Sequence, residues 1–417
     1  WSRKENLMAW HTNYLTENGS SLGSLQNEYP YIFALLQMNP QSVTNRSRNY
    51  FNARKQELLR ESEPATLPYH IVLDPCDACN LACPLCVHST ESDGRSKTMM
   101  DDNILKQVLN EFETSLIRLD FFNWGEPLLH PKFAKIVSQA HSQGIYTRTS
   151  SHMYHLKNFQ PEAIIDSGLD YFVCSIDGAT QETYRKYRIG GEFKVVLKNA
   201  QALAEAKTKR NSLTPILDWQ YLVMSQNESE IEDAQKLAVD IGFDVFRYGG
   251  ARGVLANRIR KKTEENFKES SKYLLSGDHP LSEYTVEGGK LHTREYEGCQ
   301  WLWGKMAIHA NGGISPCWTS WKNQDDFANT NDGSIKDIWH GKVFKNARRT
   351  ATSGGAPTGE LICHTCAFNK SFVNPPDGQE EEVSENDILK IAELCRAAGK
   401  KIDSNVVNEI LKEKNNA

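Results

Sequence analysis

Short apolar segments alternate with helix-spaced segments about six times between residues 69 and 250. The first apolar segment, His70–Leu73, reads as a strand, and residues 216–224 and 245–248 close the series. Repeated alternation of this kind is typical of a parallel sheet covered by helices. No G-x-G-x-x-G motif follows the first strand, which disfavours a dinucleotide-binding sheet. We therefore expect an α/β fold built as a partial (β/α)6 TIM-like barrel.

A cysteine-rich loop follows the first predicted strand directly. After Cys76, it carries Cys79, Cys83 and Cys86 in a C-x3-C-x2-C spacing. Three soft thiolates this close in sequence suit three corners of one metal cluster better than a set of disulfides. The spacing favours a [4Fe-4S] cluster with one open iron; the alternative is a zinc site with Cys76 as fourth ligand. Because barrel chemistry lies where strands end, this loop is the expected active site.

A second set of cysteines lies in the last third of the chain. Cys299, Cys317, Cys363 and Cys366 offer four thiolates, which suit either an auxiliary cluster or a zinc ribbon. Residues 306–317 read as a hairpin with an Asn-Gly-Gly turn, and 333–339 and 344–349 as short helices. Four cysteines fill a cluster's ligand positions, so this cluster is better suited to electron transfer than to substrate binding.

Composition limits the classes of binding partner and the cellular compartment that we expect for this chain. The chain has a net charge of −5 and a pI of about 6.2, so no basic face for nucleic acid is expected. No run of about 18 apolar residues is present, so we expect no membrane span. The ten cysteines are clustered, and the first residues have no signal-peptide pattern, which favours a reducing, cytoplasmic setting.

Several motifs, in order, resemble the radical SAM superfamily. The cysteine loop matches its C-x3-C-x2-C motif. Residues 123–128 (Asn-Trp-Gly-Glu-Pro-Leu) resemble its Gly-Gly-Glu-Pro turn, with Trp124 where Gly is common. Residues 149–152 (Thr-Ser-Ser-His) stand where many members have Ser-Thr-Asn, with His152 replacing Asn. Residues 175–178 and 187–191 look like the subgroup with C-terminal SPASM or twitch domains, and the second cysteine set resembles the twitch form.

The resemblance implies a set of cofactors. These are a [4Fe-4S] cluster that binds S-adenosylmethionine (SAM), a second auxiliary [4Fe-4S] cluster, and SAM itself. The expected electron donor is a reduced flavodoxin or ferredoxin-type protein. The residues expected to contact SAM are Gly125, Glu126, Ser151, His152, Ser175, Asp177 and Arg188.

Three residues near predicted strand ends are candidates for contact with substrate: Arg247, Tyr248 and Tyr221. Other conspicuous residues receive a structural interpretation. Cys76 is expected not to be a ligand, and Cys174 and Cys395 are expected to lie in the core or in a helical tail.

The expected organisation has four segments. They are a helical N-terminal extension (1–67), the radical SAM barrel (68–255), a linker with a small α+β auxiliary-cluster domain (256–372), and a helical C-terminal tail (373–417). We expect a radical SAM oxidoreductase or epimerase that acts on a small molecule: a sugar, an aminocyclitol or a nucleotide-linked sugar. The alternatives are a radical SAM peptide- or protein-modifying enzyme and, from another class, a non-catalytic cluster or zinc scaffold.

Overall fold

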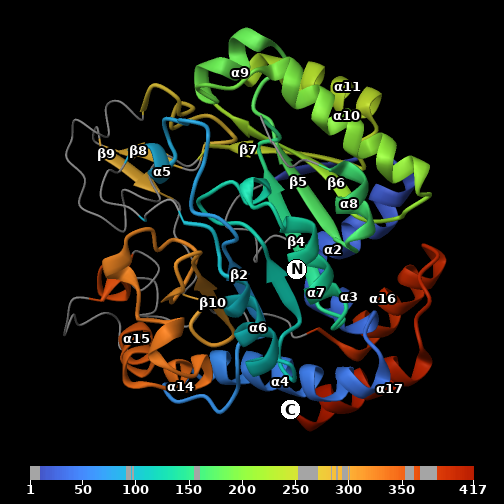
Figure 1. Ribbon diagram of the computed structural model, residues 1–417, viewed down its shortest axis with the longest axis vertical. Helices are drawn as coiled ribbons and strands as arrows, with labels where there is room; N and C mark the ends of the chain where they lie inside the picture. The colour runs from blue at the N-terminus through green and yellow to red at the C-terminus, as the bar shows by residue number, and fades with distance from the viewer. Residues whose placement is uncertain are drawn as a thin grey trace.

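The computed structural model describes residues 10–90, 95, 98–154, 160–251, 271–282, 284–287, 290–293, 299, 301–352, 361–366 and 383–417. Six consecutive parallel strands form the centre of the molecule (Figure 1). They are β2 (His70–Leu73), β3 (Arg118–Asp120), β4 (Tyr146–Ser151), β5 (Tyr171–Ser175), β6 (Ile216–Val223) and β7 (Val245–Gly250). The prediction of a partial (β/α)6 barrel is confirmed, because the sheet stays open, with β1 at one edge and β12 at the other.

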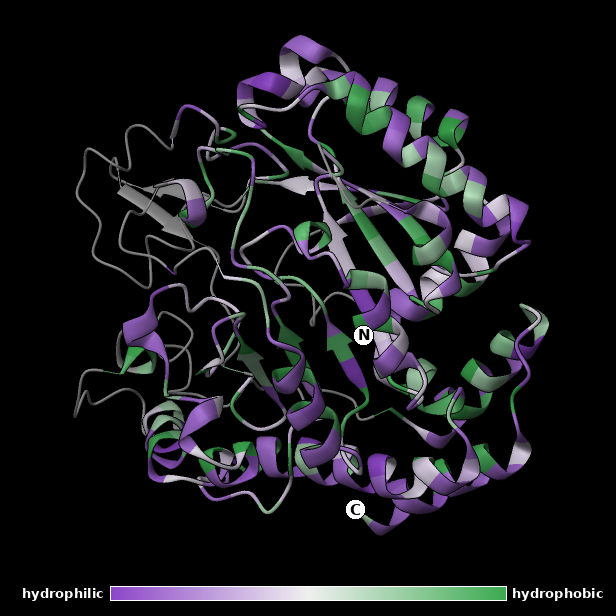
Figure 2. Cartoon of the chain, viewed as in Figure 1, coloured by the Kyte–Doolittle hydropathy of each residue, from purple (hydrophilic) through white to green (hydrophobic). Residues whose placement is uncertain are grey.

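Helices between the strands cover the outer face of this sheet. They are α6 (Asp102–Glu111), α7 (Phe133–His141), α8 (Pro161–Asp166), α9 (Gln181–Tyr187), α10 (Phe193–Lys209) and α11 (Ile231–Ile241). Figure 2 shows that these helices carry both hydrophobic and hydrophilic residues, as expected for helices between a core and solvent. No helix among the described residues is both long and apolar enough to cross a bilayer.

Alternate positions on the strands point to opposite sides of the sheet. Leu119, Phe172 and Trp219 pack in the apolar core with the outer helices. Asp120 and Asp218 lie on the other face, where their partners are Arg118 and Arg247. The barrel interior is therefore lined by buried charges.

The described part of the N-terminal segment, from residue 10 onward, includes a strand, which differs from the expected helical extension. β1 (His11–Tyr14) pairs antiparallel with β7, and the chain then forms a π-helical turn (Gly19–Gly23) and three helices. These helices are α2 (Ser24–Glu28), α3 (Pro30–Leu36) and α4 (Pro40–Leu58). The four residues of β1 have no strand periodicity of their own, and the strand forms because β7 would otherwise present an unpaired edge.

A second apolar cluster closes the barrel at the N-terminal ends of its strands. It combines residues that begin strands, such as Tyr171 and Ile216, with helices from both ends of the chain. α16 (Glu385–Ala397) and α17 (Ser404–Asn416) join α3 and α4 there, and α17 lies beside α4 (Figure 1). The two terminal segments thus form one helical layer, with the Arg48–Glu413 ion pair between α4 and α17.

The predicted hairpin in the last third of the chain is present and extends the central sheet. β10 (Lys305–Ile308) pairs parallel with β2 and antiparallel with β11 (Gly313–Ser315), and β12 (Ala328–Asn329) follows. Helices α14 (Ile335–Trp339) and α15 (Lys342–Thr352) follow and contact each other, and the ring of Phe344 in α15 lies 4.9 Å from that of Phe327, just before β12. Separately, β8 (Tyr284–Glu287) pairs antiparallel with β9 (Lys290–Thr293). We call residues 299–366 the auxiliary domain.

Candidate active site

The cysteine loop and the Gly-Glu-Pro turn are held together by close backbone contact. The Glu126 N–H donates to the Ala78 carbonyl at 2.8 Å. A Cβ atom at Gly125 would lie 1.7 Å from the Cys76 carbonyl oxygen, so only glycine allows this approach. The turn after β3 therefore fixes the loop after β2, which places both motifs at the C-terminal end of the barrel.

The three loop cysteines lie close enough to influence one another and are not in disulfides. Burial raises the pKa of Cys79 to about 12 and that of Cys86 to about 11. Buried thiols of this kind ionise only against a bound cation, and soft thiolates suit an iron–sulfur cluster. The donor set fits a three-cysteine cluster.

Cys76, which we predicted not to be a ligand, makes contacts within the loop. Its side chain is fully buried and its sulfur accepts the Ala78 N–H at 3.3 Å. Burial raises its pKa to about 11. These contacts engage the thiol within the loop itself.

Glu126 and His152 form a buried pair between the turn and the end of β4. The Glu126 carboxylate, 1 % exposed, accepts the backbone N–H groups of Leu128 and His152, each at 3.0 Å. His152 Nε2 lies 3.2 Å from Glu126 Oε2, and burial lowers the pKa of this imidazole. Glu126 Oε1 accepts only the Leu128 N–H and retains a lone pair, so Glu126 can still accept from an ammonium group.

Arg188 is anchored by a buried carboxylate. Asp177 accepts from its Nε at 2.7 Å and lies 2.6 Å from its NH2, while the other Asp177 oxygen accepts the Leu222 N–H at 2.7 Å. The remaining nitrogen, NH1, lies 3.8 Å from Cys83 Sγ. The fork of Arg188 is therefore engaged by Asp177, and only NH1 faces the cluster loop. We expected the fork itself to bind the SAM carboxylate, and this geometry does not leave it free.

The serine positions differ from expectation by one residue on β4. Ser151 Oγ accepts the Met153 N–H at 3.0 Å, and this side chain is buried. Ser150, at the neighbouring position, instead lies 3.1 Å from Ser175, Oγ to Oγ. Because adjacent strand residues face opposite sides, Ser150 and Ser175 share the interior face, and Ser151 does not.

Of the three predicted substrate contacts, the structure places only Arg247 in the barrel interior. It pairs with Asp218 and lies over the Trp10 ring at 5.1 Å. The fully buried Tyr221 donates its hydroxyl to the Asn227 carbonyl at 2.7 Å within the core. Tyr248 stacks on His11 of β1 at 4.8 Å. The expectation that these two tyrosines point toward substrate is not met, because they alternate with the interior-facing positions.

Arg148 is an interior residue that the sequence interpretation missed. It lies two residues before Ser150 on β4, over the rings of Tyr171 and Phe122 at 5.1 and 5.8 Å. Its Nε has no hydrogen-bond partner, and no carboxylate forms an ion pair with it among the described residues. Burial lowers its pKa, and neighbouring arginines act in the same direction. The period-two pattern of β4, extended back from Ser150, would have identified it.

The four cysteines of the auxiliary domain converge. Burial raises the pKa of the Cys363 thiol well above its usual range, and the charges of the other three cysteines raise it further. Cys317 follows β11, and its sulfur lies 2.9 Å from Thr319 Oγ1. Four soft donors in one buried place suit a fully ligated cluster.

An aromatic group joins the turn to the auxiliary domain. The Trp124 indole donates to the Ser320 carbonyl at 3.2 Å. Its ring lies 6.1 Å from the rings of both Trp318 and Trp321. His88, two residues after Cys86, lies 5.6 Å from Trp321. The large residue at the usual Gly position thus packs between the two cysteine sets.

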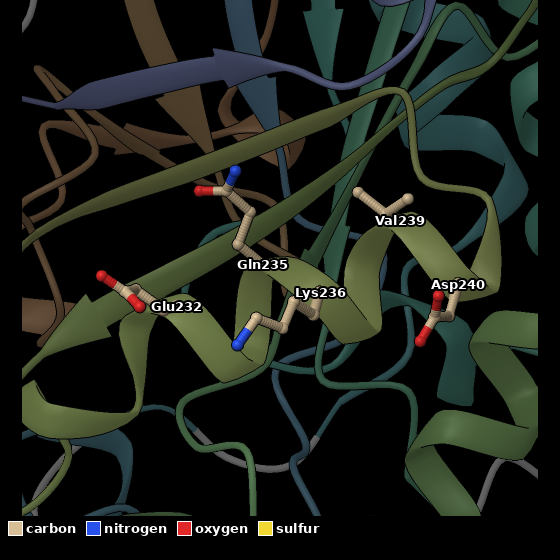
Figure 3. Close-up of a pocket in the computed structure, with 5 residues that line it drawn as sticks. All are labelled: Glu232, Gln235, Lys236, Val239 and Asp240. Atoms are coloured by element: carbon tan, nitrogen blue, oxygen red, sulfur yellow. The ribbon is translucent and has the colours of Figure 1, made fainter.

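One surface hollow lies elsewhere. Figure 3 shows that its lining residues all belong to α11: Glu232, Gln235, Lys236, Val239 and Asp240. No cysteine or predicted site residue contributes to it, so it is not part of the candidate active site.

Comparison with known proteins matches both cysteine sets to family models. The radical SAM superfamily model covers residues 73–238, and the SPASM iron–sulfur cluster-binding domain covers 299–367. The PqqA peptide cyclase of Methylocella silvestris is 22 % identical over 299 residues, covering 68 % of this chain and 76 % of that protein. The PqqA peptide cyclase of Rhizobium meliloti is 20 % identical over 338 residues, covering 76 % and 84 %.

A solved structure shows the same fold. Streptococcus suis SuiB, bound to its precursor peptide SuiA, has a TM-score of 0.50 and 16 % identity, with 76 % of this chain and 74 % of that chain covered. The cluster ligands predicted from the sequence lie within the two matched regions, and their donor sets fit one SAM-binding and one auxiliary [4Fe-4S] cluster. The chain belongs to the radical SAM superfamily and carries a SPASM domain at its C-terminal side.

Proposed function

We propose that this radical SAM enzyme modifies a peptide or protein substrate. The observation that carries the proposal is the extent of its likeness to the two PqqA peptide cyclases, which covers 68 % and 76 % of this chain. These relatives are named for a peptide substrate. They favour the peptide alternative over the sugar or aminocyclitol substrate that we first expected.

The cluster and SAM, when bound, supply a carbon-centred radical that removes a hydrogen atom from the substrate. The protein's own residues position these groups and exclude water. Glu126 offers a carboxylate to the SAM ammonium, and Arg188 is held by Asp177 beside Cys83. Ser150 and Ser175 present hydroxyl groups on the interior face nearby.

Arg148 supports a substrate with an acidic group. Arg148 is half-buried, but its Nε is buried without a hydrogen-bond partner, and a carboxylate from the substrate would supply one. Its planar fork suits a carboxylate. We propose that Arg148 binds an acidic side chain or a terminal carboxylate of the peptide.

The auxiliary cluster has a proposed role as an electron acceptor. Its four cysteines leave no iron free for substrate, which suits removal of one electron from a substrate radical and a net oxidation.

The test combines cluster assembly with two classes of substrate. After anaerobic reconstitution, we expect about eight irons per chain and formation of 5′-deoxyadenosine from SAM by the reduced protein. Peptides encoded beside this gene are then compared with nucleotide-linked sugars and aminocyclitols, and mass spectrometry follows each one. A mass change in a peptide, reduced in Arg148→Met without loss of SAM cleavage, supports the proposal. Turnover of a sugar with unchanged peptides overturns it.

A further inference from the structure

Three buried side chains meet where the cysteine loop contacts the hairpin of the SPASM domain. Asp74 follows β2, Asp77 lies two residues before Cys79, and His309 follows β10. One carboxylate oxygen from each aspartate and one nitrogen of His309 all lie within 4.8 Å of one another. The three residues are 1 %, 0 % and 0 % exposed. The Asp74 N–H donates to the Ile308 carbonyl at 2.9 Å, which ties the two segments together at this point.

The two carboxylates have no hydrogen-bond partners, although both are buried. None of their four oxygens completes a hydrogen bond. The backbone N–H groups of Asn123 and Trp124 face Asp74, and that of Ala310 faces Asp77, without reaching hydrogen-bond geometry. Buried carboxylates without partners are costly, so a ligand at this place would relieve a real penalty.

The hydrogen bonds of His309 determine which of its nitrogens carries the proton. Ser315 donates its hydroxyl to Asp326 Oδ1 at 2.7 Å. Because that proton is used, Ser315 must accept from His309 Nε2, which lies 2.9 Å away. The other nitrogen, Nδ1, therefore bears a lone pair, and it lies 3.7 Å from Asp74 Oδ2. Nδ1 has no hydrogen-bond partner.

The lone pair of His309 Nδ1 faces the Asp74 carboxylate, and a positive charge between these two groups would be attracted to both. A histidine that binds metal commonly donates its second ring N–H to a carboxylate or to another acceptor, which fixes the tautomer. His309 has this arrangement through Ser315 and Asp326.

The charges of the group formed by Asp74, Asp77 and His309 are also unbalanced. Arg95 lies nearby, but its NH1 and NH2 donate to the two oxygens of Asp326 at 2.8 and 2.5 Å. In the described part of the chain, no lysine or arginine forms an ion pair with Asp74 or Asp77. No basic side chain thus neutralises the two carboxylates, and a bound dication would do so.

We propose that Asp74, Asp77 and His309 bind one divalent cation, such as Mn²⁺, in a site separate from both iron–sulfur clusters. Two carboxylate oxygens and one imidazole nitrogen form a donor set that suits borderline and hard dications, whereas the cluster sites offer only thiolates. The cation joins the strand end that leads into the SAM-cluster loop to the hairpin that carries Cys317. It fixes the position of one cluster-binding segment against the other, whichever substrate the barrel takes.

The experiment uses the full chain with both clusters reconstituted. Mn²⁺ is titrated anaerobically, and the EPR signal of free Mn²⁺ reports how much is bound. We expect one Mn²⁺ per chain. Asp74→Asn and His309→Gln should each weaken binding at least about tenfold, with iron and sulfide counts unchanged. Matched controls are Asp233→Asn and His279→Gln, which change the same residue types at ion pairs on the outside of the barrel. Both should bind Mn²⁺ as the unmodified chain does.

Two results would overturn the proposal. One is a cluster-loaded chain that binds no stoichiometric Mn²⁺, which would leave protons or water as the only occupants of the group. The other is Mn²⁺ binding that both site variants retain at full strength, which would place the cation elsewhere. If Asp74→Asn does not assemble its clusters, His309→Gln alone decides between these results.

Discussion

Replacement of Asp177 by asparagine tests whether the buried ion pair between Asp177 and Arg188 makes a large contribution to the free energy of unfolding. Asp177 is fully buried and the Arg188 side chain is 12 % exposed, so the substitution leaves a guanidinium in the interior without a countercharge. Loss of one partner from a buried ion pair costs about 3–5 kcal/mol. The side chain keeps its shape, so the change should come from the charge and not from a cavity.

A matched pair on the surface provides the control. Asp166 accepts two N–H groups of Arg210, each at 2.7 Å, but the two side chains are 52 % and 37 % exposed. Asp166→Asn removes the same chemical group from similar geometry, and water replaces it. We expect no measurable change in stability.

The assay is urea unfolding of the two variants beside the unmodified chain, with SAM binding measured on the cluster-loaded proteins. Asp177→Asn should lower the unfolding free energy by about 3–5 kcal/mol and weaken SAM binding, because NH1 of Arg188 loses its orientation near Cys83. Equal unfolding free energies for Asp177→Asn and Asp166→Asn would refute the argument from burial.

Three further predictions follow from other contacts. Burial lowers the pKa of His70 to about 4, so between pH 6.5 and pH 4 the unfolded chain binds a proton at this imidazole that the folded chain does not. The free energy of unfolding should therefore fall by about 3 kcal/mol from pH 6.5 to pH 4, and urea unfolding curves of His70→Asn should show a weaker dependence on pH. Trp124→Ala should destabilise the junction by about 2 kcal/mol and lower auxiliary iron, whereas Trp124→Phe should retain most of it; equal iron in both variants would contradict this. Cys79→Ala and Cys317→Ala should each reduce bound iron from about eight to about four per chain, while Cys76→Ala should leave it unchanged.

Much of the barrel was predictable because most of its strands, such as β2, β5 and β6, carry an apolar signal of their own. β2 matches its predicted bounds, and β6 ends one residue before the predicted segment does. The hairpin of the auxiliary domain was predictable from its Asn-Gly-Gly turn. β1 was missed because its four residues are polar and become a strand only by pairing with β7.

The site was predictable in its motifs but not in its side-chain directions. Motif matching selected Ser151, whereas the residue on the interior face is Ser150, because one position on a strand changes the side of the sheet. Tyr221 and Tyr248 were misplaced for the same reason. The group of Asp74, Asp77 and His309 left no sequence signal, since it forms only when β10 pairs with β2.

The position of β2 makes the SPASM domain part of the barrel's folding unit. β2 lies between β3 and β10, so it is an interior strand only while the domain that supplies β10 is present. A chain cut before residue 299 would convert β2 into an edge with unpaired backbone groups, at the strand that leads into the SAM-cluster loop. The barrel of this protein is therefore not a separable module: removal or exchange of its C-terminal partner would first show as aggregation and loss of the SAM cluster.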